Sequence, residues 1–107
     1  MDASAMAPER LEERAGEVAG VLGLMANPKR LLILCKLLEG GRTVGALAAE
    51  VGLSQSALSQ HLARLREAGL VATRRSAQSI TYTLASREVR VLLATLYELY
   101  CADDRLA

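Results

Sequence analysis

Apolar residues recur at helical spacing along most of the chain, and short breaks divide this pattern into segments. The first segment predicts a helix over about residues 9–22 with one apolar side. The dipeptide Asn27-Pro28 predicts the start of a second helix, because Asn is a good N-cap and Pro is favoured at the first helical position. Two glycines that follow Glu39 indicate where this second helix ends.

A very short turn separates the third and fourth segments. Apolar positions predict a helix from Val44 to Val51 that stops at Gly52, and residues 52–54 form the turn. The next helix runs up to Gly69 and opens with short polar residues. Its expected buried stripe, at the spacing i, i+4 and i+7, consists of Leu58, Leu62 and Leu65. This is the construction of a helix-turn-helix, whose second helix packs one face on its own domain and offers the other to base edges and phosphates.

The last third of the chain changes from helical period to strand period and back. Residues 70–75 and 79–84 are rich in Val, Ile, Thr and Tyr, and they predict two strands around a turn at residues 76–78. The turn lacks Asn-Gly or Gly-Gly, so its type stays open. Ser86 then caps a last helix that reaches about residue 102. The fold expected is mainly α with a small β-hairpin, a winged helix-turn-helix of four helices, two strands and a fifth helix.

Composition limits the chain to one modest domain. The 107 residues are 51% hydrophobic but include no Phe and no Trp, so a core of Leu, Val and Ala favours packed helices. No apolar run approaches the ~20 residues of a membrane span, and the N-terminus lacks the pattern of a secretion signal. We expect residues 1–8 to be disordered, residues 9–107 to form one DNA-binding and dimerisation domain, and the protein to be cytoplasmic with no membrane partner.

Charge is unevenly distributed, although the net charge is only +1. Residues 1–20 hold five acids against two arginines, whereas residues 54–90 hold six arginines against two glutamates. The basic part coincides with the predicted helix-turn-helix, as the electrostatic footprint of a protein that binds double-stranded DNA should. The alternative is an ordinary solvated face.

The polar face of the second helix of this motif supplies the candidate DNA contacts. Gln can pair bidentately with adenine, and Ser can reach a base or a phosphate. Arg is better placed for phosphate, and the single His, beside the leucine stripe, is expected to pack or to contact phosphate rather than bind a metal. The alternative is an exposed helix face without a ligand. The candidates on this helix are Ser54, Gln55, Ser56, Ser59, Gln60, His61 and Arg64.

The order of the elements and three stretches of sequence resemble the arsenic-repressor (ArsR/SmtB) family of bacterial transcriptional repressors. The resemblance covers roughly residues 15–102. It implies that Arg74, Arg75 and Gln78 on the hairpin contact the minor groove or the DNA backbone; the alternative is that they merely solvate the hairpin. The stretches are LMANPKRLLIL (residues 24–34), SQSALSQHLARLR (54–66) and GLV (69–71).

The last helix is apolar over more than one face, and a solitary end helix would expose that surface to water. The family resemblance implies that the first and last helices pair across a two-fold axis in a homodimer. The alternative is that the last helix packs entirely on its own domain. The candidate dimerisation residues are Leu92, Leu96, Leu99 and Tyr100.

The ligand sets of the family's metal sensors are missing from this sequence. Residues 42–48 contain no cysteine, the last helix contains no histidine, and two cysteines with one distant histidine do not complete a tetrahedral site. A Cys-x-x-Cys motif and a nucleophile–base pair are missing too. We therefore expect no metal, no cofactor and no enzymatic activity.

Cys35 and Cys101, the only cysteines, fall on the second helix and near the end of the last one. In a cytosolic protein a static disulfide is not expected, and two thiols brought together are more often redox-active or metal-binding. The alternative for Cys35 is a small core residue. The pair at this spacing, and the hairpin sequence of residues 75–78, resemble the sulfide- and persulfide-responsive branch of the family, the biofilm growth-associated repressors and their sulfide:quinone reductase repressor relatives.

This second resemblance implies a repressor that senses reactive sulfur species through Cys35 and Cys101. It would release its operator DNA when a disulfide or polysulfide bridges the pair. Three alternatives stay open: an ArsR-type metal or arsenite sensor, a repressor that responds to oxidants in general, and a winged helix that binds protein instead of DNA. The first needs a third ligand that the sequence does not show, and the last would not need the Ser/Gln face and the arginines.

Overall fold

The computed structural model describes residues 8–101, and residues 1–7 and 102–107 lie outside the described part. The disorder expected for residues 1–8 therefore falls outside it, except at Pro8, which begins a helix. The last helix, expected to reach about residue 102, ends at Tyr100. The elements are α1 (Pro8–Glu13), α2 (Ala15–Met25), α3 (Pro28–Glu39), β1 (Arg42–Thr43), α4 (Val44–Val51), α5 (Gln55–Glu67), β2 (Val71–Ser76), β3 (Ser79–Leu84) and α6 (Arg87–Tyr100).

The N-terminal helix is broken, and the single helix expected over residues 9–22 is wrong in this respect. Arg14, between α1 and α2, has φ −109° and ψ 12°, which lies outside the helical range. α2 also continues beyond the expected end to Met25, whose side chain packs into the core. The burial of this one side chain gives the additional turn of helix a tertiary reason that the sequence period does not contain.

The start of α3 is confirmed in detail. Asn27 Oδ1 accepts hydrogen bonds from the backbone N–H groups of Lys29 and Arg30, each at 3.0 Å, and Pro28 occupies the first helical position. No single helix within residues 8–101 is long and apolar enough to cross a membrane. α2 and α3 taken together would pass on length and composition, but they bend by 92° at their junction.

The hairpin belongs to a three-stranded sheet, where only two strands were expected. The strand order is β1-β3-β2, and Arg42 pairs with Tyr82 while Thr43 pairs with Thr81, antiparallel. β1 is two residues long, and Thr43 at its end also caps α4 by accepting a hydrogen bond from the Ala46 N–H at 3.3 Å. So short a strand has no period of its own, and only its pairing with β3 defines it.

Two backbone positions shape the sheet. Ala77 and Gln78 join β2 to β3, and Ala77 is in the left-handed region at φ 55° whereas Gln78 is not, which is the φ pattern of a type II′ hairpin turn. Gly41, just before β1, lies so close to β3 that a Cβ atom there would be 2.8 Å from Thr81 Cγ2. β1 can therefore approach β3 only because residue 41 has no side chain.

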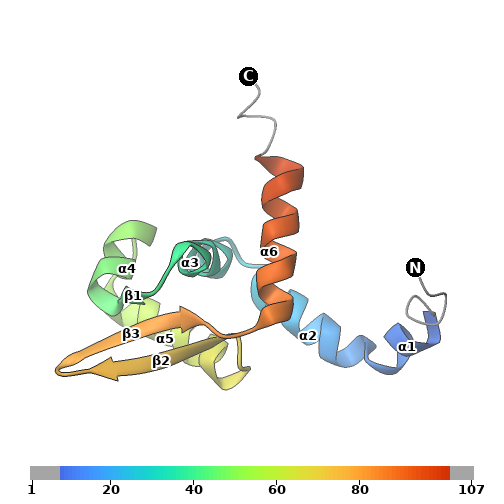
Figure 1. Ribbon diagram of the computed structural model, residues 1–107, viewed down its shortest axis with the longest axis horizontal. Coiled ribbons are helices and arrows are strands. Elements are labelled where there is room, and N and C mark those ends of the chain that lie inside the picture. The colour runs from blue at the N-terminus through green and yellow to red at the C-terminus, as the bar shows by residue number, and fades with distance from the viewer. Residues whose placement is uncertain (1–7, 102–107) are drawn as a thin grey trace.

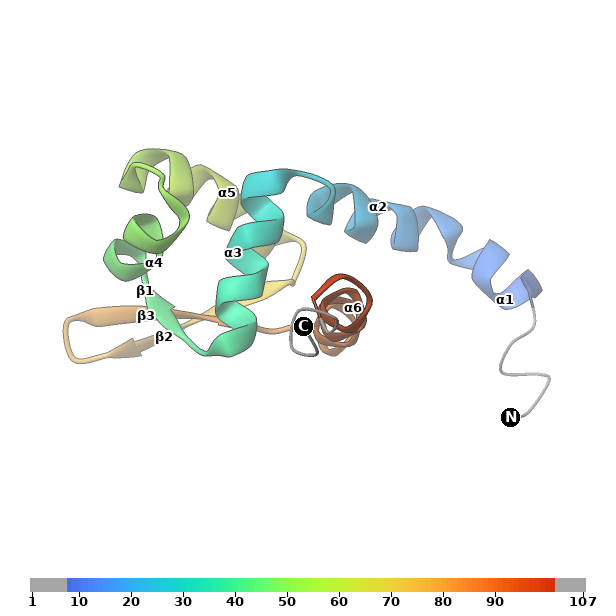
Figure 2. The same ribbon diagram turned by 90° about the horizontal axis from the view of Figure 1, so that it is seen from above.

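One aliphatic core ties these elements together. Among residues 8–101, fifteen apolar residues are buried, drawn from α2 to α6 and from the base of the hairpin. The expected stripe on α5 is confirmed, since Leu58, Leu62 and Leu65 are at most 1% exposed. In Figure 1, α4, α5 and the hairpin lie towards one end of the molecule, α1 and α2 extend towards the other, and α6 stands between them. In Figure 2, α3 and α6 are neighbours whose axes cross steeply.

Candidate nucleic-acid interface and cysteine cavity

The turn between α4 and α5 is fixed from within the protein. Gly52 ends α4 in the left-handed conformation at φ 70°, and the Leu53 N–H reaches back to the Ala48 carbonyl oxygen at 3.1 Å. Lys29 Nζ, from the start of α3, donates a hydrogen bond to the Val51 carbonyl oxygen at 2.8 Å. The expected turn at residues 52–54 is confirmed, and Lys29 is a positioning residue that the sequence analysis missed.

The expected polar face of α5 is exposed over its whole length. Ser54 is the N-cap, and its Oγ accepts a hydrogen bond from the Ala57 N–H at 3.1 Å. The remaining candidates on this helix lie beside or opposite the buried leucines, His61 is half-buried, and the others are exposed: Gln55, Ser56, Ser59, Gln60 and Arg64. The helix thus offers amide and hydroxyl groups to a partner while its other face is held in the core.

His61 lies in a positive field at the edge of this face. Partial burial lowers its pKa below the ordinary histidine range, and the charges of Arg30 and Arg64 lower it further. The imidazole is therefore neutral near pH 7. Arg30 has a structural role of its own, since its Nε donates to the Leu24 carbonyl oxygen at 2.7 Å and holds the end of α2 against α3.

The candidate residues of the hairpin are also exposed. Arg74 and Arg75 lie on β2, opposite Thr81 and Ile80, and Gln78 lies in the turn. The ion pairs within residues 8–101 involve other arginines, so the guanidinium groups of Arg74 and Arg75 are not neutralised by a carboxylate of the described chain. α5 contacts β2, and the hairpin tip projects away from the domain (Figure 1). The two candidate surfaces are therefore neighbours, one on α5 and one on the hairpin.

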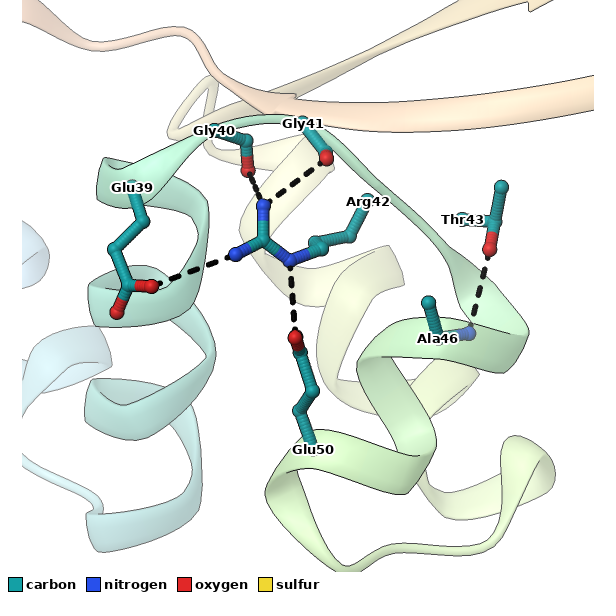
Figure 3. A network of polar contacts seen from close by, with 7 residues as sticks. All are labelled: Glu39, Gly40, Gly41, Arg42, Thr43, Ala46 and Glu50. Atoms are coloured by element: carbon teal, nitrogen blue, oxygen red, sulfur yellow. Dashed lines mark hydrogen bonds and ion pairs between the residues drawn. The ribbon is translucent and has the colours of Figure 1, made fainter.

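Arg42 joins the end of α3, the sheet and α4 (Figure 3). Its Nη1 donates to the carbonyl oxygens of Gly40 at 2.8 Å and Gly41 at 3.2 Å. Its Nε lies 3.0 Å from a carboxylate oxygen of Glu50 on α4, and its Nη2 lies 3.5 Å from one of Glu39 on α3. The sequence analysis did not single out this residue, because nothing in the local pattern shows that one side chain reaches three elements.

A cavity of about 670 Å³, partly open to solvent, lies between α3 and α6 and has both cysteines in its wall. Neither cysteine is in a disulfide; Cys35 is exposed and Cys101 is half-buried. The alternative of Cys35 as a core residue is therefore wrong. Partial burial raises the pKa of the Cys35 thiol, and the charges of Cys101 and Glu39 raise it further, against the opposing effect of Lys36. The remaining wall residues are Leu31, Leu38, Glu39, Leu93, Leu96, Tyr97 and Tyr100.

α6 leaves much of its apolar surface uncovered in the single chain. Val89 and Leu93 are buried in the core, so part of the helix packs on its own domain. The candidate dimerisation residues are not buried: Leu92 and Leu96 are partly exposed, Leu99 is 69% exposed and Tyr100 is 78% exposed. A groove of about 270 Å³ lies beside them and is lined by Leu22, Met25, Ala26, Leu31, Leu92, Thr95 and Leu96.

Within residues 8–101, no group of three or more His, Cys, Asp or Glu side chains is arranged to hold a metal ion. Cys35 and Cys101 in the cavity, with Glu39 as the one carboxylate of its wall, do not form such a group.

Residues 27–73, which contain the whole helix-turn-helix, match the family model described as "Bacterial regulatory protein, arsR family". The transcriptional activator HlyU of Vibrio cholerae is 46% identical over 97 residues, which cover 91% of this chain and 90% of the relative. This chain belongs to the arsR family.

Two solved structures of the family share its fold. The transcriptional repressor BigR from Xylella fastidiosa superposes with a TM-score of 0.83 at 41% identity, covering 89% of this chain and 97% of that one. The homodimeric winged helix-turn-helix DNA-binding domain of a possible ArsR-family regulator from Mycobacterium bovis gives a TM-score of 0.75 at 33% identity, covering 94% and 91%. This arsR-family protein is thus a transcriptional regulator with a winged helix-turn-helix fold, and α5 and the hairpin stand where that fold has its second helix and wing.

Proposed function

We propose that this regulator is a repressor that binds double-stranded operator DNA through α5 and the hairpin. The observation that carries the proposal is the exposed Ser/Gln face of α5 beside arginines that no described carboxylate neutralises. In this arrangement α5 enters the major groove, where Gln55 and Gln60 reach base edges and Ser54, Ser56 and Ser59 reach bases or phosphates. His61 and Arg64 contact phosphate, and Arg74, Arg75 and Gln78 contact the minor groove or the backbone.

The test begins with selection of a binding site from random duplex DNA, followed by titration of variants. Gln60→Ala is expected to lose about 1–3 kcal/mol of sequence discrimination per half-site, because a base contact is removed. Arg75→Ala is expected to weaken binding to all sequences and to reduce the salt slope by about one, because a phosphate contact is removed. Arg14→Ala, which removes the same charge at the α1–α2 break, is the matched control. If Gln60→Ala and Arg75→Ala both bind like wild type, the interface is elsewhere.

The repressor is proposed to act as a cytoplasmic homodimer whose seam is formed by α6 with α2. Support comes from the exposed apolar residues Leu92, Leu96, Leu99 and Tyr100, from the groove beside them, and from the homodimeric M. bovis domain. Two heads related by a two-fold axis would contact two half-sites of a near-palindromic operator.

Cys35 and Cys101 are proposed to form the switch of this repressor, with an organic persulfide, R–S–SH, as inducer. The supporting observation is that both thiols line one cavity between α3 and α6. A thiolate of the pair attacks the outer sulfur of the persulfide, the S–S bond of the donor breaks, and RS⁻ leaves with the electron pair. The second thiolate then attacks the inner sulfur of the new Cys–S–SH group and expels HS⁻. Two protein thiols are oxidised to a disulfide, and the persulfide is reduced to RSH and H₂S.

A polysulfide bridge forms from the same reactants when more persulfide is consumed. A tetrasulfide, for example, takes three R–S–SH and yields three RSH and one H₂S. Either bridge ties α3 to α6. Leu96 and Tyr100 belong both to the cavity wall and to the proposed dimer interface. The bridge therefore changes the relative position of the two winged helix-turn-helix units in the dimer and lowers their affinity for DNA.

Peptide mass spectrometry and DNA titration test this switch together. Persulfide treatment of reduced protein is expected to link Cys35 to Cys101 within one protomer and to release DNA, and dithiothreitol should restore binding. The variants Cys35→Ser and Cys101→Ser should each stay bound to operator DNA after persulfide treatment. Zinc should have little effect, because two thiolates leave a metal under-coordinated. If both cysteines stay free thiols after persulfide treatment, or if the double serine variant also releases DNA, the switch is rejected. If hydrogen peroxide makes the wild-type protein release DNA equally well, a general oxidant sensor is favoured. If arsenite makes it release DNA, a metalloid sensor is favoured.

A further inference from the structure

Lys29 places a positive charge at the turn that leads into α5. The residue is exposed on the first turn of α3, but its Nζ is held in place, because it donates a hydrogen bond to the Val51 carbonyl oxygen at 2.8 Å. A Cβ atom on Gly52, the next residue, would lie 3.8 Å from the same Nζ. The ammonium group therefore lies against the backbone of the turn that ends at Ser54, the N-cap of α5.

No carboxylate within residues 8–101 neutralises this ammonium group. The ion pairs of the described chain join two arginines to glutamates and do not include Lys29. An ammonium group has three N–H donors, and Val51 accepts only one of them. The next residue, Arg30, and Arg64 on α5 are both close enough to lower the pKa of His61. The region between the start of α3 and the exposed face of α5 is therefore positive and attracts an anion.

The position of this charge fits the path of a DNA backbone. When the N-terminal half of α5 enters the major groove, the phosphates that border the groove pass beside the residues where the helix begins. The ammonium group of Lys29 lies at that place, against the turn before Ser54. Because one hydrogen bond already holds the side chain, Lys29 loses less conformational freedom on binding a phosphate than a lysine that extends into solvent.

We propose that Lys29 is a further DNA-contacting residue, whose ammonium group donates to a phosphate of the operator backbone while it holds the α4–α5 turn through Val51. The inference rests on the proposed function, because it requires α5 to lie in the major groove. A phosphate contact carries no sequence information. Lys29 therefore adds affinity and fixes the register of α5, and the choice of bases is left to the Ser/Gln face.

The salt dependence of DNA binding separates a phosphate contact from a structural bond. Full-length reduced protein is titrated with its selected duplex and with an unrelated duplex at several salt concentrations. Each phosphate contact adds roughly 0.9 to the slope of log affinity against log salt. Lys29→Met should lower this slope by about one for each bound protomer on both duplexes, which is roughly eight-fold in affinity between about 1 M and 0.1 M salt. A turn that is merely loosened would weaken binding equally at every salt concentration.

Three further variants control for charge, hydrogen bonding and position. Lys29→Arg keeps a positive donor and should keep the wild-type slope. Lys29→Gln keeps an N–H donor without the charge, so it should lower the slope as Lys29→Met does, and it replaces that variant if Lys29→Met does not fold. Lys36→Met removes the same side chain from the last turn of α3 and should leave the slope unchanged.

Uncharged methylphosphonate linkages, placed one at a time along the selected duplex, locate the contact. At least one position in each half-site should weaken the wild-type protein by a factor similar to that of Lys29→Met and should leave Lys29→Met itself unchanged. If the variants without the charge keep the wild-type slope, or if every methylphosphonate weakens both proteins equally, Lys29 holds the turn without touching DNA and the inference is wrong.

The variants of the proposed interface separate the two possible failures. If Gln60→Ala and Arg75→Ala weaken binding as expected but Lys29→Met keeps the slope, the interface stands and only the Lys29 contact is rejected. If Gln60→Ala and Arg75→Ala bind like wild type, the proposed interface fails and the inference fails with it.

Discussion

Replacing Arg42 by methionine should measurably loosen the joint between α3, the sheet and α4. Methionine keeps an unbranched stem of similar reach but cannot donate a hydrogen bond. The side chain of Arg42 is only 22% exposed, and its guanidinium group binds the carbonyl oxygens of Gly40 and Gly41 together with the carboxylates of Glu50 and Glu39. The substitution removes all of these bonds and leaves two backbone acceptors without their partner.

The free energy of unfolding that Arg42→Met loses is the sum of these contacts. Glu39 is 60% exposed and its oxygen is 3.5 Å from Arg42, so its pair contributes close to nothing. Glu50 is more covered and closer, and it contributes about 0.5–1 kcal/mol. The charged donor bound to two carbonyl oxygens adds about 1.5 kcal/mol. The sum is about 2 kcal/mol, or roughly 10 °C in melting temperature for a domain of this size.

Urea denaturation followed by far-ultraviolet circular dichroism checks this value. Protein concentration is held fixed between variants, because a dimer gains apparent stability with concentration. The matched control is Arg14→Met, whose bidentate pair with Glu17 is highly exposed and which we expect to leave the midpoint unchanged. An Arg42→Met midpoint that coincides with wild type would show that the joint is held by the apolar core alone and that the reasoning is wrong.

Three further outcomes are expected. Gly41→Ala should lose about 1–3 kcal/mol in the same denaturation assay, because its methyl group would lie 2.8 Å from Thr81 Cγ2; wild-type stability would mean that β1 can move aside at no cost. Leu96→Glu should be a monomer by sedimentation equilibrium at micromolar concentration and should bind operator weakly, and a dimeric variant would refute the α6 seam. Because the pKa of Cys35 is raised, chiefly by burial, its alkylation by iodoacetamide should still accelerate above pH 9, and Glu39→Gln should move that rise to lower pH. A rise at the pH of a free cysteine peptide would contradict this last expectation.

Local chemistry was enough to predict the helix boundaries that depend on one or two neighbouring residues. Asn27 and Ser86 cap their helices through their own side chains, and Gly52 ends α4 through its own backbone angle. Each of these signals acts within four residues, so the sequence carries it directly. The leucine stripe of α5 was predictable for the same reason, because its period is a property of one helix.

Long-range contacts decide the features that the sequence analysis did not predict. The two residues of β1 are a strand only because Tyr82 and Thr81 lie opposite them. The roles of Lys29 and Arg42 depend on carbonyl oxygens and carboxylates that the fold brings to them. Cys35 was assigned correctly to a helix, α3, and Cys101, expected near the end of the last helix, is the residue that follows α6. The cavity that both line exists because α3 and α6 cross, and no spacing along the chain contains that angle.

The placement of the tyrosines gives the cavity an optical property. The chain has three tyrosines and no tryptophan, so its intrinsic ultraviolet emission comes from phenol rings alone. Tyr97 and Tyr100 stand in the wall beside Cys35 and Cys101, whereas Tyr82 lies in the sheet opposite Arg42. Disulfides and thiolates quench the fluorescence of a neighbouring phenol. Ionisation or bridging of the cysteines should therefore lower the fluorescence of two of the three tyrosines. The intrinsic fluorescence of the protein can then report the state of its cysteines without an added label.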